Sequence, residues 1–268
     1  MIALRPRRAP SLGRCALPAL ILLATLCLSS GAMALGKDDQ IGITLLRLGQ
    51  GFDTRPGAVE QLLWEANKRT SLLVREQPLT LELGHADLFR SPLLVLLGQG
   101  PFEPLSEAQV ARLSRYLRAG GALFVDDASP LGDDGFDVSL RRELARVLPG
   151  RPLVRLSNDH TLYRSFFLLE RAYGRIDRSP FTEGIDLDDR TAVIYSRNDL
   201  FGAFGRDPLG GWRLPVVPGG ETQREMAFRL GINLVMYATC LSYKRDQVHV
   251  TEILRRRKWR VDGSGSAR

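Results

Sequence analysis

The fold class is indicated by residues 92–127, PLLVLLGQGPFEPLSEAQVARLSRYLRAGGALFVDD. It opens with a continuous apolar run, Pro92 to Leu97, which is typical of a strand buried on both faces of a sheet. Ser106 then suits the N-cap of a helix whose apolar residues recur at helical spacing. Gly120-Gly121 ends that helix, and a second apolar run follows at Ala122 to Val125. The stretch therefore predicts a strand, a helix and a second buried strand.

The same alternation is expected along the rest of the chain. Strands are predicted at 41–48, 71–75, 153–156 and 192–195, and helices from Pro56, over 140–147, 222–241 and 250–259. Such an order predicts an α/β fold with a mainly parallel sheet flanked by helices. In sheets of this kind, ligands bind beyond the carboxyl ends of the strands. Polar residues that directly follow strands are therefore the first candidates for a site.

The first 34 residues have the layout of an export signal. Four arginines precede an apolar stretch, Leu17 to Leu28, and Ala32 and Ala34 form an A-x-A cleavage pattern. We therefore expect cleavage near Ala34 and a periplasmic or secreted protein. The alternative is an uncleaved membrane anchor, because Cys15 to Leu35 holds no charge. The remainder predicts a single α/β domain over residues 35–262 and a disordered tail over 263–268.

Removal of such a signal changes what the composition implies. The whole chain has 37 basic and 30 acidic residues, for a formal net charge of +7. Without the four signal arginines there are 33 basic residues against 30 acidic ones, or +3. So small an excess gives little support to nucleic-acid binding. Of the three cysteines only Cys240 lies beyond the signal, so the core rather than a disulfide is expected to hold the fold.

Four blocks of sequence, in this order, resemble the domain-of-unknown-function 4159 family. They are LSEAQVARLSRYLRAGGALFVDD, LSNDHTLYRSFF, EGI…DDRTAVIYSRNDL and EMAFRLGINLVMYATCLSYKRDQVHVTEILRRRKW. With the preceding LLVLLGQG they cover most of residues 40–260. The resemblance implies a bacterial protein with a flavodoxin-like sandwich similar to class I glutamine amidotransferases. It implies a fold and no reaction.

The amidotransferase comparison can be tested on the residues. Those enzymes use a cysteine on a tight turn after a strand, with a base nearby to activate the thiol. Here Cys240 falls in an apolar helical stretch, where a buried and inert thiol is expected. A serine elbow of the G-x-S-x-G type is also absent from the sequence. Glutaminase chemistry of that kind is therefore not expected.

Several polar residues follow predicted strands and would converge at one edge of a parallel sheet. Asp126 or Asp127, together with Asp159, His160 and Asp199, could serve as acid and base or could ligate a divalent metal. Beside them, a ligand could bind to Gln99, Arg197 and Asn198. The competing interpretation is structural, because Asp and Asn are common in turns and caps. Successive side chains of a strand also point to opposite faces, so Asp126 and Asp127 should not share a site.

The basic cluster near the end of the chain has two interpretations. Arg255, Arg256, Arg257 and Lys258, followed by Trp259, could contact an anionic membrane surface. They could equally form a solvated helix end, where cations are favoured.

Two classes of function follow from the sequence. The first is a non-catalytic module of the cell envelope that binds a small ligand or an envelope protein, with no cofactor. The second is a hydrolase, either metal-assisted or dependent on a carboxylate and histidine, acting at the carboxyl ends of the strands. Whether the protein is an enzyme stays open at this point. The two classes differ in geometry, since a hydrolase needs its acids and His160 within reach of one another.

Overall fold

The computed structural model describes residues 42–49, 52 and 54–239. The predicted export signal, Cys240, the helix expected over 250–259, its basic cluster and the C-terminal tail lie outside these residues. Within them, no helix combines the length and the apolar character needed to cross a membrane.

The strands of the described residues form one sheet in the order β2-β1-β3-β4-β7-β6-β5. Their bounds are β1 Ile43–Arg47, β2 Leu79–Glu82, β3 Leu93–Gly98, β4 Ala122–Asp127, β5 Val154–Arg155, β6 Glu183–Leu187 and β7 Arg190–Ser196. The pairs from β2 to β7 are parallel, whereas β6 is antiparallel to both β7 and β5. The predicted α/β fold with a mainly parallel sheet is confirmed.

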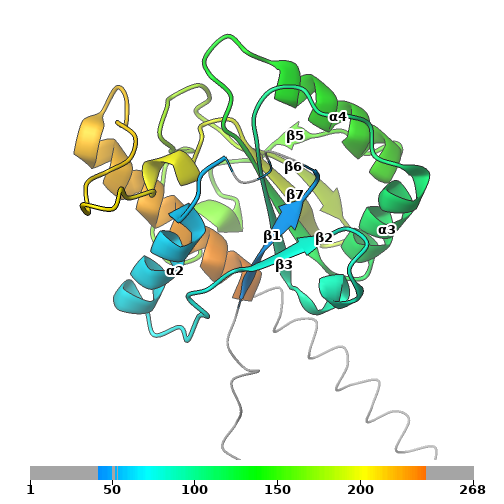
Figure 1. Ribbon diagram of the computed structural model, residues 1–268, viewed down its shortest axis with the longest axis horizontal. Helices are drawn as coiled ribbons and strands as arrows, with labels where there is room; N and C mark the ends of the chain where they lie inside the picture. Colours follow the sequence, from blue (N-terminus) through cyan, green and yellow to red (C-terminus); the bar gives the residue numbers. More distant parts are fainter. Residues whose placement is uncertain (1–41, 50–51, 53, 240–268) are drawn as a thin grey trace, which may run out of the picture. The chain divides into compact units, whose positions relative to one another are not determined.

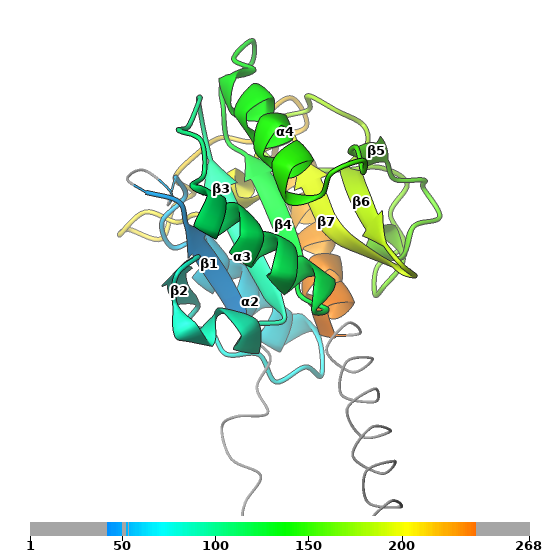
Figure 2. The same cartoon turned by 90° about the vertical axis from the view of Figure 1, so that its right-hand side faces the viewer.

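Helices cover both faces of this sheet (Figures 1 and 2). One face carries α2 (Ala58–Arg69) and the long helix of residues 220–239, and the other carries α3 (Glu107–Arg118) and α4 (Gly135–Val147). In the described part of the chain, short 3-10 helices lie in the connections: η2 (Ala86–Arg90), η3 (Thr161–Tyr163) and η4 (Phe201–Ala203). The result is an arrangement of helix, sheet and helix layers.

The strand, helix and strand predicted over residues 92–127 are present as β3, α3 and β4. Ser106 caps α3 with a capping box, in which its hydroxyl accepts from the Gln109 N–H and the Gln109 side chain accepts from the Ser106 N–H. Beyond the end of α3, Gly120 takes a φ of +102°, a conformation that favours glycine. The chain can therefore reverse and enter β4, whose six residues are all buried.

Two predicted elements are wrong in position. Residues 71–75 do not form a named strand, and the strand after α2 is β2 at Leu79–Glu82. Only Val74 of the apolar run is buried, because Leu73 faces solvent and Asn67 binds both backbone groups of Val74. The helix expected over 140–147 begins earlier, at Gly135, because Phe136 packs in the core in its first turn. Local apolar runs do not show which of their residues the sheet will bury.

The apolar core has two parts, one on each face of the sheet. Phe124 belongs to the part beneath α2 and the helix of residues 220–239, while Val125 belongs to the part beneath α3 and α4. The alternation continues into Asp126 and Asp127, so their side chains leave opposite faces, as the sequence predicted.

Gly98, the last residue of β3, is expected to be intolerant of a side chain. A Cβ there would lie 2.1 Å from Cε2 of the buried Phe136 ring. Gly98→Ala should lower the free energy of unfolding by about 1–3 kcal/mol through overpacking, measured by chemical denaturation. Gly84→Ala is the control, because a Cβ at Gly84 would meet nothing within 4 Å. Equal stability of the two variants would contradict this packing account.

Candidate functional site

The strands β1, β3, β4 and β7 end on one side of the sheet, which we call the carboxyl-end edge. In the sheet, β2 lies on one side of β1 and β3 lies on the other. The direction in which the chain adds strands to the sheet therefore reverses at β1. Crevices at such reversals are the usual ligand sites of parallel α/β sheets. The residues that follow these four strands are therefore the ones that decide what this edge can do.

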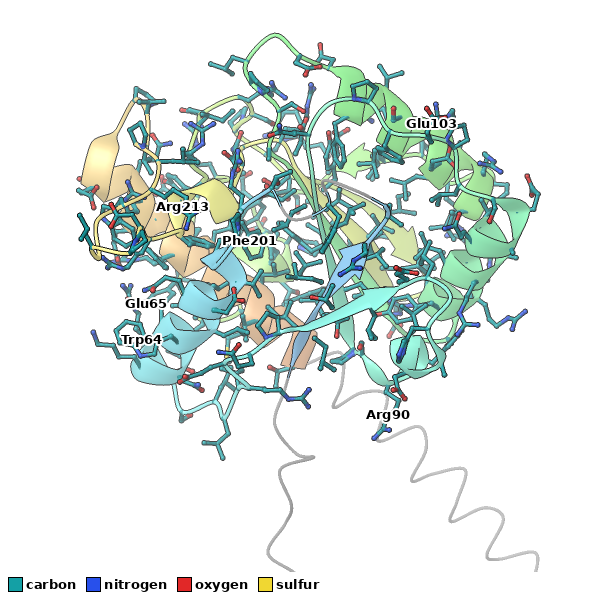
Figure 3. The ribbon with its side chains drawn as sticks, in the orientation of Figure 1. Trp64, Glu65, Arg90, Glu103, Phe201 and Arg213 are labelled. Carbon is teal, nitrogen blue, oxygen red and sulfur yellow. The ribbon has the colours of Figure 1, made fainter. Side chains whose placement is uncertain are left out.

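Asp126 is fully buried at the end of β4 and binds the turn that follows β7. Its Oδ1 accepts from the Leu200 N–H at 2.9 Å, and its Oδ2 accepts from the Phe201 N–H at 2.8 Å. Phe201, which opens η4, is labelled in Figure 3 among the side chains of this region. Both carboxylate oxygens of Asp126 therefore hold the start of η4 in place.

Asp199 is the most heavily paired acid of the edge. Arg55 donates to it through Nε and Nη2, each at 2.7 Å, which is a bidentate pair. Arg175 donates to the same carboxylate through Nε, and the Gly202 N–H reaches Oδ1 at 3.2 Å. The backbone of Asp199 has a φ of +49°, a left-handed conformation that Asp tolerates better than most residues. This single carboxylate thus joins the segments before α2, before β6 and after β7.

Asp127 makes a separate set of contacts on the opposite face. Its Oδ1 accepts from the Ser129 N–H at 2.9 Å, and its Oδ2 accepts from Arg178 Nη1 at 3.0 Å and from the Tyr195 hydroxyl at 3.3 Å. Arg178 also donates through Nη2 to the carbonyls of Ser129, Pro130 and Asp133. The buried pair of Asp127 and Arg178 therefore fixes the loop between β4 and α4.

Asn198 and Arg197, two of the candidate ligand-binding residues, also serve the fold. Asn198 is buried, and its Oδ1 accepts from the N–H groups of Arg178 and Ser179 while its Nδ2 donates to the Ser179 carbonyl. Arg197 pairs with Asp134 at 2.5 Å and approaches Asp137 at 3.9 Å. Gln99, the third candidate, is exposed beyond β3. Of the three, Gln99 has the side chain that solvent reaches most readily.

The expectation that Asp159 and His160 lie at the same edge is wrong. Asp159 is exposed and pairs with Arg164. His160 Nε2 lies 2.9 Å from the hydroxyl of Thr191, at the start of β7, and its ring lies 5.9 Å from that of Tyr237. Thr191 and Ser196 are about 16 Å apart along an extended strand. The chain turns back after β5, and this reversal carries His160 away from the carboxyl ends.

Burial shifts the pKa values of Asp126 and His160 in ways that favour their neutral forms. Burial and then the charge of Asp199 raise the pKa of Asp126 to about 7, against the opposing effects of the two backbone N–H groups and Arg55. Burial lowers the pKa of His160, partly offset by the charge of Asp186. The two groups therefore bind protons in opposite senses relative to the unfolded chain.

The residues that hold the site together include three that the sequence did not reveal. Arg55, Arg175 and Arg178 supply the cations for Asp199 and Asp127, but they follow no predicted strand and belong to no motif. We call the six residues the acid–arginine network: Asp126, Asp127, Asp199, Arg55, Arg175 and Arg178. Within the described part of the chain, no group of three or more His, Cys, Asp or Glu is placed to hold a metal ion. Asp159 and His160 are therefore not gathered with Asp126, Asp127 and Asp199 at the carboxyl-end edge.

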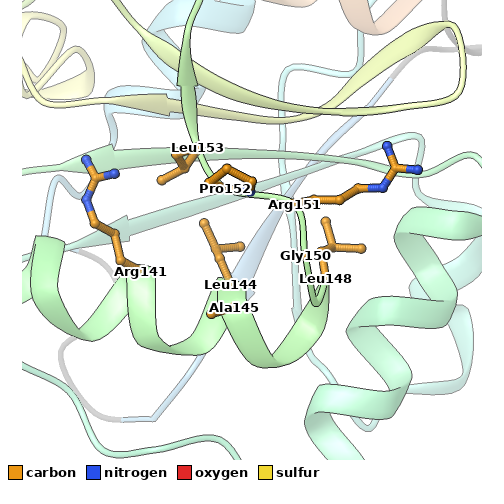
Figure 4. A pocket seen from close by; sticks show the side chains of 8 residues that line it. All are labelled: Arg141, Leu144, Ala145, Leu148, Gly150, Arg151, Pro152 and Leu153. Carbon is orange, nitrogen blue, oxygen red and sulfur yellow. The ribbon is translucent and has the colours of Figure 1, made fainter.

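Two hollows lie away from the acid–arginine network. One, of about 350 Å³, lies between α4 and the segment before β5, with Leu144 and Leu153 on facing sides and Arg141 and Arg151 at its ends (Figure 4). The other, of about 360 Å³, lies beside the ends of β1 and β2 and is lined by residues that include Arg47, Glu82 and His85. Neither is lined by any of the acids that the sequence singled out.

The comparison with protein families agrees with the resemblance seen in the sequence. The model of the family described as Domain of unknown function (DUF4159) matches residues 42–239, which is most of the chain. No curated protein has a sequence that matches this one. The likeness to class I glutamine amidotransferases stays an expectation.

Removal of the Arg178 guanidinium should lower the free energy of unfolding more than removal of a surface arginine. Arg178→Met leaves Asp127 buried without its cation, which should cost about 3–5 kcal/mol of stability. Arg164→Met is the matched control, because the pair of Arg164 and Asp159 is exposed and should contribute less than about 1 kcal/mol. Chemical denaturation measures both losses. Similar values for the two variants would contradict a structural role for the buried pair.

The free energy of unfolding should fall as the pH rises, because of the raised pKa of Asp126. The folded state holds this proton up to about pH 7, whereas the unfolded chain loses it near 3.8. The stability that it contributes is therefore complete below about pH 4 and is lost as the pH rises through 7. Relative to Asp126→Asn, the wild type should lose up to about 1.4 kcal/mol per pH unit in this window. Denaturant titrations from pH 4 to 8 measure the difference, and parallel curves would refute it.

His160 serves as a control in the same titration, because its pKa is shifted in the opposite direction to that of Asp126. Its lowered pKa means that the folded state binds fewer protons than the unfolded chain, so its contribution grows as the pH rises towards 6.5. His160→Gln should remove that growth and make the fall of stability with pH steeper than in the wild type.

Proposed function

The chain belongs to the domain-of-unknown-function 4159 family, and we propose that it is a non-catalytic binding module of the bacterial cell envelope. It would bind a partner protein through the loops at the carboxyl-end edge of its sheet. The observation that carries this proposal is the state of the acids at that edge. Asp126, Asp127 and Asp199 are all fully buried, and all accept hydrogen bonds from the protein itself.

Carboxylates that accept hydrogen bonds from the protein in this way hold loops in position and are not free to react with a substrate. The acid–arginine network ties together the segments that contain Thr54, Ala128, Arg175 and Asp199, which are distant in sequence. Loops that are held in one conformation lose little entropy on binding, which favours recognition of a partner. The carboxylates of the network already accept hydrogen bonds from the protein, so a partner protein that contacts the ordered loops is the better candidate.

A hydrolase is less well supported by the same geometry. The pKa of Asp126, about 7, would suit a general base. Both of its oxygens, however, already accept backbone N–H groups of η4, and His160 lies near the other end of β7. A carboxylate and histidine mechanism would have to bring together groups that lie near opposite ends of β7.

Export to the cell envelope is the part of the proposal that rests on residues 1–34. Their sequence has the basic, apolar and small-residue sections of a cleaved signal. Fractionation of the producing bacterium would find a shortened chain in the periplasm or medium. A full-length chain in the cytoplasmic fraction would count against this part alone.

Site-specific photo-crosslinking tests the binding surface. A photoreactive phenylalanine at Gln99, beyond β3, should give a discrete protein adduct in cells that make the full chain. The matched control position is Leu73, which is 74% exposed but follows α2, away from the acid–arginine network. Adduct formation at position 99 and its absence at position 73 is the expected result.

The outcomes of this experiment separate the two functions. Absence of any adduct at Gln99, or equal adducts at both positions, would overturn the proposed binding edge. Turnover of ester, amide or phosphate substrates that Asp126→Asn abolishes without unfolding the protein would establish the hydrolase instead.

A further inference from the structure

We propose that residues 206–212 form a rigid recognition loop that inserts Leu209 into an apolar pocket of a partner protein, between carboxylates of that partner. The loop has the sequence RDPLGGW and follows η4. Figure 3 labels the adjacent Arg213 on the side of the molecule where α2 lies. This inference rests on the proposed binding function and adds the binding element and the chemistry of its partner.

The loop is held in shape by its own hydrogen bonds. Asp207 is the centre, because its Oδ1 accepts from the N–H groups of Leu209 and Gly211, each at 2.9 Å. The Asp207 N–H donates to the Gly211 carbonyl at 2.8 Å, and the Gly210 N–H donates to the Asp207 carbonyl at 3.0 Å. Arg206 closes the loop through a β-bridge to Trp212. Such a loop is already ordered before it meets a partner, so binding costs little conformational entropy.

Trp212 anchors the base of the loop to the core. The guanidinium groups of Arg206 and Arg224 both lie over its ring, at 3.8 Å and 4.3 Å from the ring centroid. Its indole N–H donates to Glu221 at 3.1 Å, and its ring lies 5.8 Å from that of the buried Phe228. The base is therefore fixed to the helix of residues 220–239, and the tip extends from a rigid support.

Leu209 at the tip has no packing role in the structure. It is 97% exposed, the largest value among the exposed large hydrophobic side chains of the described residues. A single exposed leucine is common on protein surfaces and needs no explanation by itself. Here, however, the loop is held by its own hydrogen bonds and by the ring contacts of Trp212, and it presents that leucine at a tip between Pro208 and Gly210. This arrangement is typical of an apolar anchor that fills a pocket in a partner.

The charges around the tip indicate what borders the pocket. Arg206 and Arg213 are exposed, and within the described part of the chain neither has a carboxylate at ion-pair distance. Asp207 directs its Oδ1 to backbone N–H groups of its own loop. Arg206 donates to the Gly210 carbonyl at 2.6 Å and Arg213 donates to the Arg206 carbonyl at 3.2 Å, but neither guanidinium is paired with a carboxylate of the described residues. Two cations in this state beside an apolar anchor fit a pocket rimmed by Asp or Glu, because complementary charge orients the encounter. A single leucine is a small apolar surface for insertion into a bilayer, so a protein partner is favoured over a lipid surface.

Crosslinking in cells that make the full chain tests this loop. A photoreactive phenylalanine at Leu209 should give a discrete adduct with another protein. The same residue at Leu168, which is 78% exposed on a different segment, should give none. Arg213→Glu, combined with the probe at position 209, should lower the adduct yield at least tenfold, whereas Arg213→Lys should leave it within about twofold. Peptide mapping should place the crosslink beside Asp or Glu residues of the partner.

Other results would overturn the inference in distinct ways. An adduct at Gln99 without one at Leu209 would leave the binding function standing and refute the loop, whereas adducts at neither position would refute both. An adduct of two copies of this chain would make the partner a second copy. Cosedimentation of the full chain with phosphatidylglycerol and phosphatidylethanolamine vesicles, lost in Leu209→Ser, would make the target a membrane. Equal adduct yields from Arg213→Glu and Arg213→Lys would refute the proposal that carboxylates border the pocket of the partner.

Discussion

The carboxylate of Asp199 is the contact on which the arrangement of this protein's carboxyl-end edge depends. It is fully buried, and an isolated buried charge is costly unless it is paired and hydrogen-bonded. Arg55 meets it with a bidentate pair, Arg175 adds a further donor, and the Gly202 N–H completes the set. Because those groups come from separate connections of the fold, satisfying one charge fixes the relative positions of several loops.

This constraint explains why the strand-end acids here bind the loops of their own chain. Asp126 binds η4 through both oxygens, and Asp127 holds Arg178, which in turn binds three carbonyls of the loop before α4. Each acid is committed to its own loop on its own face of the sheet. Acids at the ends of parallel strands therefore suggest a reaction only when their oxygens remain free for a substrate.

The surface that results combines rigid loops with a few side chains left for contact. Gln99 is exposed beyond β3, and Leu209 is exposed at the tip of a loop that carries its own hydrogen bonds. Buried polar networks of this kind are costly to assemble but leave a single well-defined conformation when every member is satisfied. Such order is what recognition of a partner requires, and it does not require a nucleophile.

The fold class and the local details of its elements could be predicted from residue patterns alone. The periodicity of residues 92–127 predicted β3, α3 and β4, the capping role of Ser106, and the opposite orientation of Asp126 and Asp127. Each depends on residues close together in the chain. The folded structure was needed to show that His160 lies beside Thr191 and that residues 71–75 form no named strand of the sheet. It was also needed to show that Arg55, Arg175 and Arg178 meet the buried acids. Those contacts join residues far apart in sequence, and which arginine meets which acid depends on how the loops pack, which no local pattern encodes.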